Sequence, residues 1–180
     1  MTQLVQPQTN LKLTAITDIT AFLQSHGITF TQWDTPAQLS QTASPEEILA
    51  AYRDVLDPYM AANGYQTADV VNIHSGIENY PAIREKFLAE HTHAEDEVRF
   101  FVEGRGLFWF NLDGELVFNV LCTAGDLISV PQGTKHWFDA GREPNVKAIR
   151  IFSNTEGWVP HYTGSNIDAE YRDPALILTR

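Results

Sequence analysis

The chain has 180 residues, of which 43% are hydrophobic, so it can bury one sizeable core and a single domain over 1–180 is expected. Twelve basic against 23 acidic residues give a formal net charge of −11, which disfavours nucleic acid and anionic membranes as partners and leaves small-molecule chemistry open. The single cysteine, Cys122, excludes an intramolecular disulfide and a thiolate cluster for metal, and we expect it to be a small buried apolar residue.

The N-terminus, Met-Thr-Gln-Leu-Val-Gln-Pro, has no positively charged start followed by an apolar stretch. No run of about 18 apolar residues occurs anywhere in the chain. The sequence therefore predicts neither secretion nor membrane insertion, and a reducing cytoplasm is the simplest location.

Residues 1–90 are predicted to mix short strands with three helices, over 18–25, from 44 to about 62 and from about 81 to 90. The second helix has the clearest start signal. Ser44 is a good N-cap, a proline follows at the first helical position, and Glu47 completes a capping box. This half of the chain is expected to cover a barrel formed by the other half.

The segment His91-Thr-His93-Ala-Glu-Asp-Glu97 has the spacing of a metal site on β-strands. Side chains alternate along a strand, so an extended chain from His91 onward would place His91, His93 and Glu97 on one face, together with Arg99. A helix would separate the two histidines by about 200°, because it has 3.6 residues per turn. A strand therefore brings the candidate ligands together, whereas a helix scatters them.

From Val98 to Val102 the chain is rich in β-branched and aromatic residues, which predicts a strand. Its even-numbered face, Val98, Phe100 and Val102, is apolar, and its odd-numbered face carries the candidate ligands. The apolar face needs a cover, and the N-terminal helices are the expected one.

After Glu97 the pattern is strand after strand with short turns, which predicts an antiparallel barrel or sandwich over 91–180. Asp-Gly at 113–114 predicts a hairpin. Pro131 and Gly133 predict a turn that sets His136 at the start of the next strand. His136 taken alone could be an ordinary partly buried histidine, but a metal site collects ligands from separate strands, so we include it as the fourth ligand.

These two segments resemble the two conserved stretches of the cupin superfamily. The matching residues are His91, His93, Glu97 and Gly104 in the first stretch, and Gly125, Pro131, Gly133 and His136 in the second. Glu85 and Ala140 depart from the general pattern, and neither is a ligand. More narrowly, residues 90–100, 131–138 and 149–158 resemble the acireductone dioxygenase family, whose length and ordering also agree with the whole chain. The implied fold is mainly β, a jelly-roll-like barrel with N-terminal helices packed outside.

The resemblance implies a metal-dependent dioxygenase of methionine salvage, with one Fe(II) or Ni(II) per chain, that cleaves acireductone with O₂. In that family the iron form yields formate and 4-methylsulfanyl-2-oxobutanoate. The nickel form yields formate, carbon monoxide and 3-(methylsulfanyl)propanoate. Imidazole suits both metals, so the sequence does not choose between them.

Arg99 and Arg150 are the candidate groups for an anionic substrate. The resemblance links Arg99 to formation of the substrate dianion, and the alternative is a guanidinium paired with Asp96 or Glu95. Arg150 lies in an apolar strand, and the alternative for it is an edge position from which its side chain reaches water.

Two acids and three aromatic residues are further candidates. Glu90 and Asp96 flank the ligands and are expected to orient the imidazoles, or else to be acids on a solvated loop. The resemblance also implies apolar walls for the methylsulfanyl tail, which would be formed by Phe87, Phe138 and Trp158.

Other functions stay open at this stage. The chain could be a cupin enzyme of another chemistry, or a cupin that binds a small molecule without catalysis. The complete four-ligand set favours an enzyme over a pure binding module. The large negative charge favours a monomer.

Overall fold

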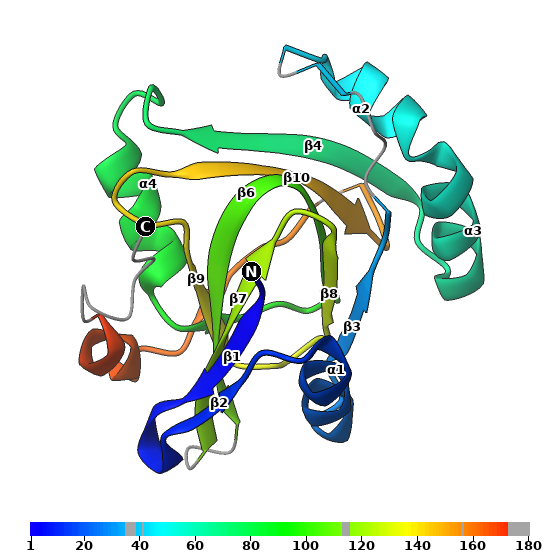
Figure 1. Ribbon diagram of the computed structural model, residues 1–180. Coiled ribbons are helices and arrows are strands. Elements are labelled where there is room, and N and C mark those ends of the chain that lie inside the picture. Colours follow the sequence, from blue (N-terminus) through cyan, green and yellow to red (C-terminus); the bar gives the residue numbers. More distant parts are fainter. Residues whose placement is uncertain (35–38, 41, 113–115, 156, 173–180) are drawn as a thin grey trace.

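The structure is a computed structural model and describes residues 1–34, 39–40, 42–112, 116–155 and 157–172. Two antiparallel sheets share one long strand, β6, and wrap around a common interior (Figure 1). The strands are β1 Gln3–Gln6, β2 Leu11–Leu13, β3 Thr29–Gln32, β4 Thr67–His74, β5 His91–Thr92, β6 Glu97–Leu112, β7 Leu116–Thr123, β8 Asp126–Val130, β9 His136–Asp139, β10 Asn145–Phe152 and β11 His161–Tyr162. The helices are α1 Ile16–Ser25, α2 Pro45–Ala51, α3 Arg53–Asn63 and α4 Tyr80–Leu88, with 3-10 turns at Pro7–Thr9 and Ile167–Tyr171.

Strand β6 joins the two sheets because each of its halves has different neighbours. Its first half pairs with β8 and β10, and β3 and β4 complete that sheet. Its second half pairs with β7 and β9, in a sheet of order β11-β5-β9-β6-β7-β1-β2. The strand arches from one sheet into the other (Figure 1). The predicted mainly β fold with flanking helices is confirmed, and the barrel is open rather than closed.

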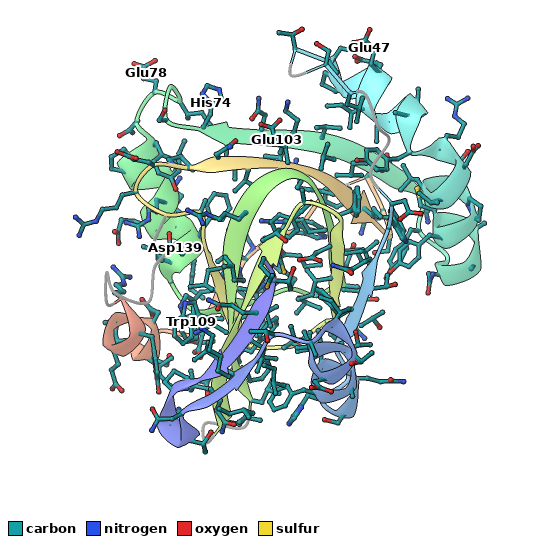
Figure 2. All side chains as sticks on the ribbon, in the orientation of Figure 1. Glu47, His74, Glu78, Glu103, Trp109 and Asp139 are labelled. Carbon is teal, nitrogen blue, oxygen red and sulfur yellow. The ribbon has the colours of Figure 1, made fainter. Side chains whose placement is uncertain are left out.

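Apolar side chains fill the space between the sheets and cover their outer faces. The interior cluster contains five phenylalanines from the central strands, Phe101, Phe108, Phe110, Phe118 and Phe138. Helices α2 and α3 pack against the outer face of β6 through Tyr52, whose ring lies 4.8 Å from that of Phe100. The predicted covering of the even-numbered face by N-terminal helices is therefore confirmed. A third cluster contains Trp109, which is labelled in Figure 2. Its ring stacks on that of Trp137 and lies 5.0 Å from that of Tyr171 in the last 3-10 turn.

The first and third predicted helices are confirmed within about two residues, as α1 and α4. The capping box of Ser44 and Glu47 is present with both of its hydrogen bonds. The prediction of one continuous helix from 44 to 62 is wrong, because the chain breaks at Tyr52 into α2 and α3. The break keeps Ile48 of α2 and Leu56 of α3 both buried against the same sheet.

The hairpin turn predicted at Asp113-Gly114 lies outside the described residues. The strands on either side of it, β6 and β7, pair antiparallel from Leu112 and Leu116 onward.

Within the part of the chain that the structure describes, no helix combines the length and apolar character needed to cross a bilayer.

Gly104 allows β6 and β10 to approach closely at the point where β6 passes between the sheets. Its φ is +75°, and a Cβ built there would lie 1.8 Å from the backbone oxygen of Asn145. Backbone cannot rotate away as a side chain can, so any larger residue must separate the strands.

We expect Gly104→Ala to lower the free energy of unfolding by about 3 kcal/mol, since it combines an unfavourable φ with a backbone clash. Gly64→Ala is the matched control, because Gly64 has the same φ of +75° but nothing within 4 Å of the added Cβ. It should lose only about 1 kcal/mol in denaturant unfolding. Equal losses at the two positions would show that the close approach of the strands does not matter.

Candidate metal centre

Four buried side chains converge where β5, β6 and β9 begin. His91 lies on β5 and is the Cα partner of His136 on β9, while Glu97 begins β6. His93 lies on the segment between β5 and β6. One donor atom from each of the four lies within 4.8 Å of every other. The predicted ligand set is therefore brought together as a group that could hold a metal ion.

The convergence does not arise from one extended strand, as predicted from the alternation of residues 91–99. The chain leaves β5 after Thr92 and bends before β6 starts at Glu97. The bend is held by Gly133, whose N–H donates to the His93 carbonyl, and by Gln132, whose N–H donates to Asp96. Gly133 has a φ of +76°, which confirms the predicted turn before His136.

The three imidazoles are oriented by backbone carbonyls. Nδ1 of His91 donates to the oxygen of Ala89 at 2.7 Å, and Nδ1 of His136 donates to that of Thr134 at 2.8 Å. Nδ1 of His93 donates in the same way to the carbonyl oxygen of Val159 at 3.0 Å. A carbonyl only accepts, so each Nδ1 carries the proton and each Nε2 keeps a lone pair for the centre.

Burial and neighbouring charges shift the protonation of three of these groups. Burial, aided by the neighbouring His136, lowers the pKa of His91 to about 4, so its imidazole is neutral at pH 7. Burial disfavours the ionised form of Glu97, but Arg99 and the imidazoles outweigh it and hold the pKa of that carboxyl well below its usual range. Burial opposes protonation of His93, but its hydrogen bond to Glu97 outweighs it and raises the pKa of that imidazole. The centre therefore offers a neutral imidazole at His91 and a carboxylate at Glu97, and a bound cation would compete with a proton for Nε2 of His93.

The spacing of the donors also suits a first-row divalent ion. Oε2 of Glu97 lies 3.1 Å from Nε2 of both His93 and His136. Two donors about 2.1 Å from a metal and at right angles to each other are about 3.0 Å apart. Three imidazoles and one carboxylate leave about two of the six octahedral positions for other ligands.

Arg99 lies next to the donor set and has unused hydrogen-bonding capacity. Its Nη2 donates to Oε1 of Glu97 at 2.9 Å, so its partner is a candidate ligand and not Asp96 or Glu95, the alternatives considered from sequence. Among the described residues, its Nε and Nη1 are buried without a hydrogen-bond partner. A buried unpaired donor is costly, which marks these N–H groups as places for an acceptor from a ligand.

The sequence matches a known protein family. The model of the ARD/ARD' family matches residues 3–160.

The chain belongs to the ARD/ARD' family.

Relatives and a solved structure agree with that membership. The chain is 74% identical to the acireductone dioxygenase of Picosynechococcus over 96% of this chain and 98% of that protein. It is 50% identical to the acireductone dioxygenase of Klebsiella pneumoniae over 85% of this chain and 84% of that protein. The structure of acireductone dioxygenase from Bacillus anthracis, described with a cadmium ion in its active centre, superimposes with a TM-score of 0.82 at 33% identity, covering 90% of this chain and 98% of that one.

Glu90 and Asp96 flank the candidate ligands and were predicted to orient the imidazoles. They do not contact the Nδ1 atoms of these rings. That role belongs to the backbone carbonyls. Glu90 is buried and accepts hydrogen bonds from Asn111, Thr163 and Ser165. It therefore anchors the segment after β11 to the barrel.

Asp96 instead holds three parts of the chain near the bend. Its carboxylate accepts from the N–H of Gln132 and from the hydroxyl of Tyr65, and its carbonyl accepts from the indole N–H of Trp158. It is not the partner of Arg99. Asp96 thus supports the ligand-bearing bend from outside the donor set.

Of the predicted apolar walls, two lie beside the centre. Phe138 follows His136 on the interior face of β9, and its ring lies 4.4 Å from the guanidinium carbon of Arg99. The ring of Trp158 lies 6.3 Å from that of His93. Phe87, on α4, is half-buried and packs against the interior cluster.

Arg150 is not on an edge strand, which was the alternative considered from sequence, because β10 pairs with both β4 and β6. It forms two hydrogen bonds with Asp69 on β4. Asp69 was missed in the sequence, since it is 81 residues away and no motif marks it. Only the register of β4 against β10 identifies it.

The prediction that Cys122 is buried is confirmed. Three histidines lie outside the donor set: Nδ1 of His26 contacts the carbonyl of Phe22 at the end of α1, and His74 and His161 are exposed.

Proposed function

We propose that the protein is a metal-dependent dioxygenase that cleaves acireductone with O₂. The observation that carries this proposal is the buried set of four donors beside Arg99, whose Nε and Nη1 have no hydrogen-bond partner among the described residues and can donate to a ligand. The names of the relatives and of the similar structure support the same reaction.

His91, His93, Glu97 and His136 would hold the metal, and the donor chemistry fits an iron(II) or nickel(II) ion. When bound, such an ion would hold the oxygens of an enediol and lower their pKa, so that the substrate is present as an electron-rich anion that can react with dioxygen.

The protein's own groups prepare the substrate for that reaction. Arg99 donates to a substrate oxygen through Nε or Nη1 and so favours the anionic form. Its remaining donor stays on Glu97, which keeps the guanidinium in place. The rings of Phe108 and Phe138 lie against Arg99 and exclude water, which strengthens this contact. Arg150, Phe87 and Trp158 complete the proposed substrate-binding group.

The metal decides the product set in this proposal. We expect apoprotein loaded with Fe(II) to yield formate and 4-methylsulfanyl-2-oxobutanoate, and apoprotein loaded with Ni(II) to yield carbon monoxide, formate and 3-(methylsulfanyl)propanoate. Elemental analysis should find about one ion per chain in both, since the described residues offer one such donor group. Loss of the enediol absorbance and chromatography of the products give the measurement.

Two results would contradict the proposal. Identical products from both forms would remove the role of the metal in choosing the reaction. Stoichiometric metal without acireductone turnover would transfer the site to another cupin reaction or to binding without catalysis.

We further propose that the protein is a monomer that acts in methionine salvage in the cytoplasm. The formal charge of −11 supports the monomer, and the proposed substrate supports the pathway. Light scattering at increasing salt concentration measures the first of these directly.

A further inference from the structure

Three charged residues form one row across neighbouring strands at the metal centre. Arg150 on β10 is the Cα partner of Asp69 on β4 and of Arg99 on β6. Residues directly opposite each other in antiparallel strands project from the same face of the sheet. The face that carries Glu97 and Arg99 therefore also carries Arg150 and Asp69.

Asp69 forms a bidentate salt bridge with Arg150. Nε of Arg150 donates to Oδ1 of Asp69 at 2.8 Å, and Nη2 donates to Oδ2 at 2.6 Å. Paired parallel bonds of this kind fix the plane of a guanidinium as well as its position. The side chains of Arg150 and Asp69 are 34% and 48% exposed, so this pair lies between the buried Arg99 and solvent.

Arg150 and Arg99 carry like charges, so electrostatic repulsion opposes the position of Arg150 beside Arg99. The guanidinium carbons of both arginines lie 5.7 Å from the ring of Trp158, so two like charges share one indole. Glu97 balances Arg99, but Arg150 has a flexible side chain that repulsion would move towards water. Asp69 is the residue that opposes this movement.

We propose that Asp69 is a positioning residue that holds the Arg150 guanidinium beside Arg99, so that two cations face one anionic ligand of the metal centre. This rests on the proposed function only in taking the anionic substrate as the natural ligand. Asp69 itself does not contact the ligand and acts through Arg150.

Asp69 has two opposite effects on the binding of an anion: its own negative charge weakens binding, and its hold on Arg150 strengthens binding. Asp69→Asn removes a negative charge near the ligand, so electrostatics alone predicts tighter binding of an anion. The same substitution removes one acceptor of the paired contact and releases Arg150, so positioning predicts weaker binding.

Oxalate is a suitable probe, since it is a small unreactive dianion with two oxygens that a metal can hold. We expect Asp69→Asn to raise the Kd of the metal-loaded protein for oxalate about tenfold in calorimetry, the loss of about one charge-assisted contact, without changing the metal content. Asp69→Glu should restore part of the affinity. Arg150→Lys should resemble Asp69→Asn, because a lysine ammonium keeps the charge but cannot form the two parallel hydrogen bonds to Asp69 that fix a guanidinium.

A double substitution tests whether Asp69 acts through Arg150. Asp69→Asn should have no further effect once Arg150→Lys is present, whereas independent roles would multiply the two losses. Glu103→Gln is the matched control, because Glu103, labelled in Figure 2, is a similarly exposed acid. It pairs with Lys147, which lies on the same strand β10 as Arg150. The control substitution should leave the oxalate Kd unchanged.

Several outcomes would overturn the inference. They are an unchanged or lower Kd in Asp69→Asn, multiplicative losses in the double variant, or no binding of oxalate by the unaltered protein. Acireductone turnover by the unaltered protein reports separately on the proposed function. Binding that depends on Asp69 without such turnover would reject the function and keep the role of Asp69.

Discussion

Glu97→Gln should remove the metal and abolish turnover. The carboxylate oxygen Oε2 lies 3.1 Å from two of the imidazoles, so it completes the donor set, and an amide neither carries the charge nor binds a hard cation as well. Changes to residues merely around a metal site cost about 10–100-fold in affinity, so loss of a ligand should exceed about 100-fold. We expect less than about one tenth of an ion per chain by elemental analysis, with activity at background.

Asp126→Asn is the control for loss of a buried carboxylate. Asp126 is fully buried but accepts its hydrogen bonds from Thr2, Gln32 and Thr123. That variant should unfold at a lower denaturant concentration yet keep its metal. Full metal content and turnover in Glu97→Gln would exclude Glu97 from the metal centre.

Arg99→Met should leave the metal in place and remove the substrate's partner. The bound cation compensates Glu97 when the guanidinium is gone, so we expect about one ion per chain. The kcat/KM for acireductone should fall about a thousandfold, because the substrate loses up to two charge-assisted hydrogen bonds in a buried site. Without metal the variant should be destabilised, since the buried Glu97 carboxylate then keeps its two imidazole contacts but loses its guanidinium partner.

Two variants control for this result. Arg99→Lys keeps a charge without the planar donors and should lie between the two extremes. Arg84→Met removes a guanidinium that is held by two hydrogen bonds to Asp139, and it should lower stability without changing kcat/KM. Loss of metal from Arg99→Met would instead make Arg99 a support for Glu97 and not a group for the substrate.

Much of the metal centre could be read from the chain because its signals are local. Histidines two residues apart with a carboxylate four further on, and a histidine after a Pro-x-Gly turn, are spaced within single turns and strands. The capping box of Ser44 and Glu47 and the apolar face at Val98 and Phe100 are equally local. The donor types alone restrict the ion, and the net charge restricts the partners.

The contacts of those residues could not be read in the same way. The bend between β5 and β6 replaced the single strand that was predicted, and backbone carbonyls took the imidazole contacts predicted for Glu90 and Asp96. A carbonyl is present at every residue, so no residue type marks which of them will meet an imidazole.

The sequence by itself determined the donor set, the β class of the fold and the covering of β6 by helices, because alternation, capping and ligand spacing act over a few residues. Only the tertiary structure decided that Arg99 shares Glu97 with the metal centre and that Asp69 holds Arg150 across 81 residues. It also decided that Nε and Nη1 of Arg99 have no hydrogen-bond partner among the residues that the structure describes. The reason is register. Which residues face each other across neighbouring strands depends on the whole sheet, where a shift of one residue would turn every side chain to the other face.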